Sequence, residues 1–189
     1  AVDVRPGNIV VAVRNTESLH PLEKVLKKAN TRHQDIVVLT GRRMRGVRND
    51  QGDLTSDQIF MGFEQKLFSR VVSMAEKEGK RINLRVVPGN SIPDIIIRSA
   101  LQLKSSKVVA AVSKRMPMDE QARRLGEAWE AAGPHSRGLT LELIDRQMKS
   151  HFFDIGPHPP RLWPVDIGRL HELWLKLTRE KVGSELHHR

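Results

Sequence analysis

A strand–helix–strand unit at Ile82–Lys114 limits the fold of this chain more than any other feature. An alternating strand pattern ends at Pro88-Gly89, a Ser-x-x-Asp helix start follows, and an apolar helix runs to about Leu103. A polar turn then leads into a wholly apolar strand. A unit of about thirty residues is the size of a right-handed crossover in a parallel sheet. Because ligands of such sheets bind beyond the carboxyl ends of the strands, the loop at Ser113–Arg115 is the first candidate for a site.

The same alternation of strands and helices continues on both sides of this unit. Apolar or alternating runs predict five strands, and apolar residues at helical spacing predict four helices between them. The strands are Asn8–Val13, Ile36–Thr40, Ile82–Val87, Val108–Val112 and Leu139–Ile144, and the helices are Pro21–Asn30, Thr55–Gly79, Ser91–Leu103 and Met118–Gly133. We therefore predict a three-layer α/β sandwich with a five-stranded parallel sheet over residues 1–147.

Residues 148–189 are predicted to form a connector and a final helix. Four Gly and Pro residues within Arg146–Arg161 argue against regular structure there. After Trp163, an apolar seam with 3–4–3 spacing predicts an amphipathic helix, formed by Ile167, Leu170, Trp174 and Leu177. The helix is expected either to pack on its own domain or to serve in dimerisation or docking.

Composition restricts the class of protein and its partners. The 189 residues include no Cys, which excludes disulfides and thiolate metal sites, and no apolar run is long enough to span a membrane. The first residue is Ala1 rather than Met, which suggests a piece of a longer chain. The formal net charge of +10 favours anionic partners. Aromatic residues amount to 4% with no Tyr, so recognition of nucleic acid by base stacking is not expected.

The densest basic cluster lies in the stretch Gly41–Leu54. It contains four arginines, namely Arg42, Arg43, Arg45 and Arg48. One interpretation is a solvated loop, and the other is a patch for anionic lipid headgroups.

No motif of catalysis is present in the sequence. The chain lacks a nucleophile elbow, a Walker loop, a Rossmann fingerprint and a His-Glu-x-x-His pair. Of the eight His, only His187 and His188 are adjacent. We therefore predict neither an enzyme nor a metal site.

The first strand, the long second helix and the run VVPGNSIPDIIIRSA together resemble the universal stress protein family. Gly89, Pro93 and Ile96 stand close to the family pattern, and the resemblance covers roughly residues 8–145. It implies a sheet in the strand order 3-2-1-4-5 and a protein that often forms dimers.

The same resemblance implies a nucleotide site, which this sequence carries in degenerate form. ATP-binding members have an Asp after the first strand, where this chain has Arg14. Their Gly-x-x-Gly pair falls here on Val112 and Arg115, and Gly126 is one residue away from the third glycine position. The typical ATP site is thus not expected. An anion or nucleotide bound by side chains remains an alternative, with Arg14, Asn15, Ser113, Lys114 and Arg115 as contacts.

A narrower resemblance extends over the whole chain. The stretches SSKVVAAVSKRMPMDEQARRLGEAWEA and FDIGPHPPRLWPVDIGRLHELWLKL are similar to the cytoplasmic C-terminal region of bacterial amino-acid permeases of the amino acid–polyamine–organocation superfamily. This resemblance implies a non-enzymatic regulatory or assembly domain at the cytoplasmic face of the bacterial inner membrane, with the transporter's membrane domain and a second copy as partners. The alternatives are a freestanding universal stress protein that binds ATP, AMP or another nucleotide and, third, a nucleic-acid binder.

Overall fold

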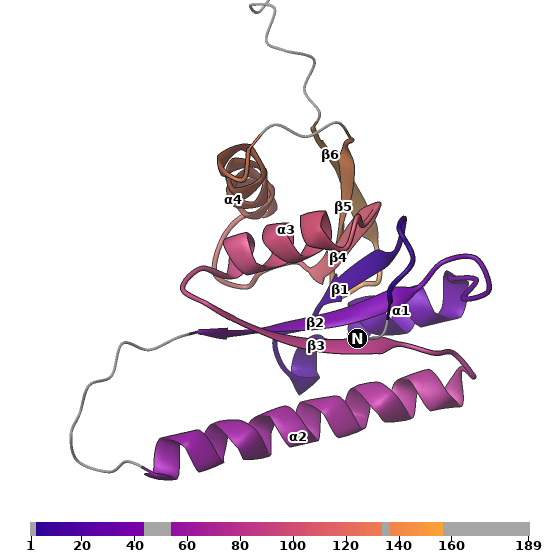
Figure 1. Cartoon of the computed structure of the whole chain (residues 1–189), viewed down its shortest axis with the longest axis vertical. Coiled ribbons are helices and arrows are strands. Elements are labelled where there is room, and N and C mark those ends of the chain that lie inside the picture. Colours follow the sequence, from indigo (N-terminus) through magenta and orange to yellow (C-terminus); the bar gives the residue numbers. More distant parts are fainter. Residues whose placement is uncertain (1–2, 44–53, 134–136, 157–189) are drawn as a thin grey trace, which may run out of the picture. The chain divides into compact units, whose positions relative to one another are not determined.

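The computed structural model describes residues 3–43, 54–133 and 137–156, apart from the side chains of residues 43 and 54–61 (Figure 1). Its strands are β1 (Ile9–Ala12), β2 (Ile36–Arg43), β3 (Asn83–Gly89), β4 (Lys107–Ala111), β5 (Leu139–Ile144) and β6 (Ser150–Ile155). Its helices are the 3-10 helix η1 (Thr16–Ser18), α1 (His20–Lys28), α2 (Leu54–Lys77), α3 (Ile92–Gln102) and α4 (Met118–Ala131).

The strands form one sheet in the order β3-β2-β1-β4-β5-β6. The first five strands pair in parallel, and β6 pairs antiparallel with β5. The predicted α/β fold and the predicted order of the first five strands are confirmed. The order reverses between β1 and β4, and this places a switch point at their carboxyl ends.

Alternating side chains of the strands build two cores, one on each face of the sheet. Val10 belongs to the core beneath α3 and α4, and its neighbour Val11 belongs to the core beneath α1 and α2. Both valines are fully buried. Figure 1 shows these helix pairs on opposite faces of the sheet. Apolar runs without alternation are therefore required in the central strands, because both faces are covered.

Two glycines bring α3 close to the sheet. A Cβ at Gly89 would lie 2.6 Å from Cγ1 of Ile95, and a Cβ at Gly41 would lie 2.7 Å from Cδ1 of Ile92. Gly79 ends α2 with a φ of +64°, as a left-handed C-cap residue, and the Lys80 N–H donates to the Ala75 carbonyl.

The arginine-rich stretch begins differently from the prediction. β2 continues to Arg43, and its last residues pair with β3 up to Gly89, so Gly41 and Arg42 are part of the sheet rather than of an exposed loop. α3 begins directly after Ser91, its N-cap residue, as predicted, although the Ser91 hydroxyl makes no capping hydrogen bond. On α2, Leu67 and Val71 are fully buried, whereas Phe63 is 44% exposed.

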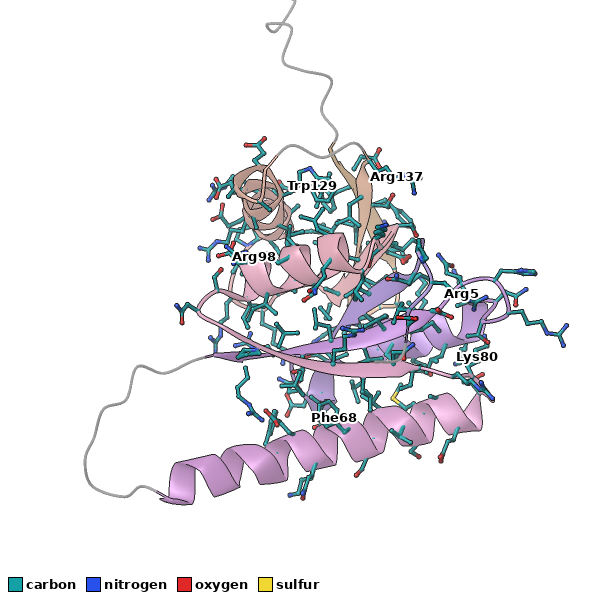
Figure 2. The ribbon with its side chains drawn as sticks, in the orientation of Figure 1. Arg5, Phe68, Lys80, Arg98, Trp129 and Arg137 are labelled. Carbon is teal, nitrogen blue, oxygen red and sulfur yellow. The ribbon has the colours of Figure 1, made fainter. Side chains whose placement is uncertain are left out.

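The sixth strand contradicts the prediction that Arg146–Arg161 contains no regular structure. Ser150–Ile155 pairs along the whole of β5, from Ile144↔Ser150 to Leu139↔Ile155. Trp129 of α4 lies between that helix and the sheet (Figure 2) and is 6% exposed. A Cβ added at Gly156 would lie 2.4 Å from Nε1 of the Trp129 indole. Phe153 and Ile155 therefore provide the contribution of β6 to the core.

The chain divides between Pro157 and His158 into two units, of which only the first contains described residues. The predicted C-terminal helix with Ile167, Leu170, Trp174 and Leu177 lies outside the described residues. Among the helices that the structure describes, none is both long and apolar enough to cross a bilayer.

Candidate functional site

The candidate site lies at the carboxyl ends of β1 and β4. The two strands are parallel neighbours with Val11 opposite Val109, so the loops that follow them leave the sheet at the same edge. Arg14 and Asn15 belong to the first loop, and Ser113–Arg115 belong to the second. The structure thus brings all five predicted residues to the switch point of the sheet, through the topology alone.

Three cations of this set face solvent. Arg14, Lys114 and Arg115 are exposed. Within the described part of the chain, their side chains form no hydrogen bond and no ion pair, in contrast to Arg5, Arg42, Arg123 and Arg124, which all pair with carboxylates. Three unpaired positive charges on two adjacent loops attract anions.

The side chains of Asn15 and Ser113 accept hydrogen bonds from backbone N–H groups of their own loops. Oδ1 of Asn15 accepts from the Glu17 N–H at 3.1 Å and so caps the 3-10 helix η1. Oγ of Ser113 accepts from the Arg115 N–H at 3.1 Å. These side chains hold the loop conformations, and a ligand would have to replace those bonds.

Gln121 in the first turn of α4 is a site residue that the sequence analysis missed. Its Oε1 accepts from the Ser113 N–H at 2.8 Å, and its Nε2 donates to the Ala111 carbonyl at 2.9 Å. The amide thereby ties the β4–α4 loop to the end of the strand and occupies a backbone N–H that would otherwise face a ligand. An amide side chain one turn into a helix after a buried strand was the available signal.

Backbone binding of phosphate is not built into this loop. α4 begins at Met118, which places Gly126 eight residues into the helix, about 12 Å from its start. The first turn of α4 carries Asp119 and Glu120. Hydrogen bonds from Arg123, and then from Arg124, lower the pKa of Glu120 to about 2, so this carboxylate is charged at neutral pH. The degenerate character of the nucleotide site stays a prediction.

The arginine cluster is only partly within the described residues. The guanidinium of Arg42 forms an ion pair with Glu64 of α2, from Nε to Oε1 at 2.8 Å and from Nη2 to Oε2. The side chain of Arg43 and all of Arg45 and Arg48 lie outside the described residues. In the described ranges, no group of three His, Asp or Glu residues is placed to hold a metal ion.

Comparison with solved structures identifies the fold. A universal stress protein from Burkholderia pseudomallei matches with a TM-score of 0.51 and 18% identity, over 73% of this chain and 96% of the other. An AMP-bound family member from Arabidopsis thaliana matches with a TM-score of 0.49 and 16% identity, over 75% and 92%. A universal stress protein from Archaeoglobus fulgidus matches with a TM-score of 0.47 and 23% identity, over 65% and 86%.

The chain has a universal-stress-protein-like α/β fold. This statement rests on the Burkholderia structure, whose TM-score is the highest of the three. No protein-family model matches the sequence, and no curated protein matches it. The sixth, antiparallel strand extends the five-stranded sheet that the resemblance implied.

Proposed function

We propose that this chain is a non-enzymatic regulatory or assembly domain that binds an anion at the carboxyl edge of its sheet. The observation that carries the proposal is the set of three exposed cations without partners in the described chain, Arg14, Lys114 and Arg115, on the two loops of the switch point. The ligand class is a phosphate-bearing nucleotide held by side-chain charge.

The two loops favour binding of phosphate by side-chain cations rather than by backbone N–H groups. Val112 and Arg115 carry side chains where a phosphate loop has glycines, and the Ser113 N–H is bonded to Gln121. A site of this kind recognises the charge of a phosphate more than the shape of a base, so it discriminates weakly among nucleotides. No residue of the two loops is placed as a general base, and we propose no hydrolysis.

Calorimetry with ATP, AMP and a cyclic dinucleotide tests the proposal. We expect binding that weakens as salt is raised and is lost in a triple variant with Arg14, Lys114 and Arg115 replaced by Ala. The matched control replaces Lys66, Arg70 and Lys77 of α2 by Ala; these residues are exposed cations with the same total charge, and the control should still bind. Equal loss in both variants would mean non-specific attraction to a basic protein, and no heat with any ligand would refute the proposal.

We propose further that the domain belongs to a membrane amino-acid transporter and works at the cytoplasmic face of the bacterial inner membrane. The support is the sequence resemblance at residues 105–131 and 153–177 to the C-terminal region of such permeases. The test is detection of the endogenous protein in cell fractions with an antibody raised against this chain. A membrane-bound species much larger than 21.5 kDa is expected.

The alternative is a freestanding universal stress protein that binds a nucleotide. It has the same fold and the same candidate site, so ligand binding does not separate the two. A species of 21.5 kDa in the soluble fraction would favour this alternative and contradict membership of a transporter.

A further inference from the structure

A hollow of about 160 Å³ lies at the amino ends of β1 and β4, at the opposite edge of the sheet from the candidate site. Its lining comes from the first residues of these two strands, from β5 and from the end of α1, and includes Ile9, Lys107, Glu142, Val25, Lys28 and Ala29. A cavity of about 150 Å³ can take a molecule of the size of benzene. The hollow therefore has room for a ligand of about six to ten heavy atoms.

Glu142 is a charged side chain on a face of β5 that is otherwise apolar at this point. It lies opposite Val109 of β4 and two residues before Ile144, and both of these neighbours are fully buried. The Glu142 side chain is 10% exposed, and its ion pair with Nζ of Lys107 has a distance of 3.7 Å. Within the described chain its carboxylate accepts no hydrogen bond. Burial of a carboxylate without hydrogen bonds costs folding free energy, so this group requires an explanation.

The oxygens of Glu142 are open to the hollow. Among the described residues, every fully enclosed side-chain N or O atom has a hydrogen-bond partner, whereas the Glu142 oxygens have none. These oxygens are therefore not fully enclosed, and Glu142 lines the hollow. The last turn of α1 also borders the hollow, and the partial negative charge of a helix C-terminus favours a cation. This part of the hollow suits a group that donates hydrogen bonds and carries a positive charge, such as an ammonium group.

Two lysine amines at the hollow suit an anionic group instead. Lys28 is exposed and Lys107 is half-buried, and neither forms a hydrogen bond within the described chain. A third lining residue, Lys24, differs from them, because its Nζ donates to the Met148 carbonyl at 2.6 Å and to Ser150 Oγ at 2.5 Å. Amines without acceptors form charge-assisted hydrogen bonds with a carboxylate.

We propose that the hollow binds a small zwitterion of the α-amino acid class. The ammonium group of the ligand donates to the Glu142 carboxylate, and the ligand's carboxylate accepts from the amines of Lys28 and Lys107. An α-amino acid carries both charged groups on a single carbon atom, so it presents them together to a hollow of this size. The site is separate from the proposed anion site, which lies at the carboxyl ends of β1 and β4, and the inference does not rest on that site.

Calorimetry of the full chain with α-amino acids of up to about ten heavy atoms, first as a mixture and then singly, tests the proposal. At least one of them is expected to bind. Two matched probes for that amino acid each lack one charge; for L-valine they are isobutylamine and isovalerate. Each probe should bind at least about tenfold more weakly, because it loses the hydrogen bonds of one charged group.

Two variants test the named contacts. Glu142→Gln removes the charge and keeps the shape, and Lys28→Ala removes an amine at an exposed position without disturbing the core. Each should weaken binding by about tenfold. Lys27→Ala is the matched control, since Lys27 is the neighbour of Lys28 in α1 and pairs with Glu23 at 3.0 Å. This control and the triple variant of the anion site should bind with unchanged affinity.

Four outcomes would overturn the proposal. They are no heat with any of the amino acids, a single-charge probe that binds as tightly as the amino acid, unchanged affinity in Glu142→Gln or Lys28→Ala, and equal weakening in Lys27→Ala.

Discussion

Gly89 shows how one missing side chain sets the distance between two layers of this protein. It ends β3 at the point where Ile95 of α3 crosses the sheet, and the Ile95 side chain would lie within 2.6 Å of an added Cβ. Ile95 is 4% exposed and belongs to the core beneath α3 and α4. The sequence pattern indicates a turn glycine at this position, whereas the structure gives the glycine a role in packing.

Replacing Gly89 by Ala is predicted to destabilise the fold by about 1–3 kcal/mol, because the added methyl group overpacks against Ile95. The matched control is Gly126→Ala on α4, where an added Cβ meets nothing within 4 Å. That change should stabilise the protein by about 0.5–1 kcal/mol through helix propensity. Urea denaturation of both variants measures the difference. Equal effects would contradict the close approach of α3.

At the scale of elements, the hairpin of β5 and β6 depends on its turn. The Met148 N–H donates to the Asp145 carbonyl at 3.0 Å, and Met148 has a φ of +65°. Oδ1 of Asp145 also accepts from the N–H groups of Gln147 and Lys149. A three-residue loop whose last residue is left-handed is a common hairpin connection, and glycine is preferred at that last position.

Met148→Gly is predicted to stabilise the protein by up to about 1 kcal/mol, because glycine adopts a positive φ without steric cost. Lys149→Gly, one residue later at the start of the strand, should instead destabilise it by a similar amount through increased unfolded-state entropy. Thermal unfolding followed by circular dichroism compares the two. Loss of stability in Met148→Gly would mean that burial of the methionine side chain outweighs the backbone strain.

At the scale of the whole molecule, the sheet needs its sixth strand. β6 covers the edge of β5 and adds Phe153 and Ile155 to the core beneath α4. The sequence-based boundary at residue 147 would remove this strand, while the division observed after Pro157 retains it.

A fragment of residues 1–157 is therefore predicted to fold cooperatively, and a fragment of residues 1–147 is predicted to aggregate or to lose cooperative unfolding. The shorter fragment leaves the β5 edge unpaired and exposes Leu139, Leu141 and Leu143, which are buried in the intact sheet. Analytical gel filtration and thermal unfolding of both fragments measure this. Two equally stable fragments would show that β6 is dispensable.

An ion pair between Arg5 and Asp35 links the N-terminal segment to the residue before β2, and it makes the stability of the fold depend on pH. Oδ1 and Oδ2 of Asp35 accept from the side chain and the backbone N–H of Arg5, and these bonds lower the pKa of Asp35. A lowered pKa in the folded state stabilises the fold above the ordinary aspartate value of about 3.9, and the stabilisation is lost as the pH falls through the folded-state pKa.

Asp35→Asn is predicted to lower the melting temperature at pH 7, and the difference from the unmodified protein should shrink as the pH falls below about 4. Melting curves at a series of pH values give the comparison. Asp119→Asn on the exposed first turn of α4 serves as the control, since no partner holds that carboxylate in the described chain. A difference that is constant with pH would exclude the Arg5 ion pair as its cause.

The sequence by itself determined the order of elements through Ile144. Buried parallel strands appear in the sequence as apolar runs such as NIVVAV, and helices appear as apolar residues at 3–4 spacing. Local periodicity is therefore enough to predict the type and order of these elements. The strand–helix–strand unit pointed to the loop at Ser113–Arg115, and the resemblance to the universal stress protein family supplied the strand order and the glycine positions occupied here by Val112 and Arg115.

Only the tertiary structure decided the features that depend on contacts between distant residues. The Gly and Pro residues that follow β6 argued against a strand there. SHFFDI forms a strand because it pairs with β5 and packs beside Trp129. The hydrogen bonds of Gln121 to the site loop and the pairing of Arg42 with Glu64 likewise appear only in three dimensions. So does the lack of partners for Arg14, Lys114 and Arg115 among the described residues. Hydrogen bonds and ion pairs join side chains whose distance in space is not encoded in their spacing along the chain.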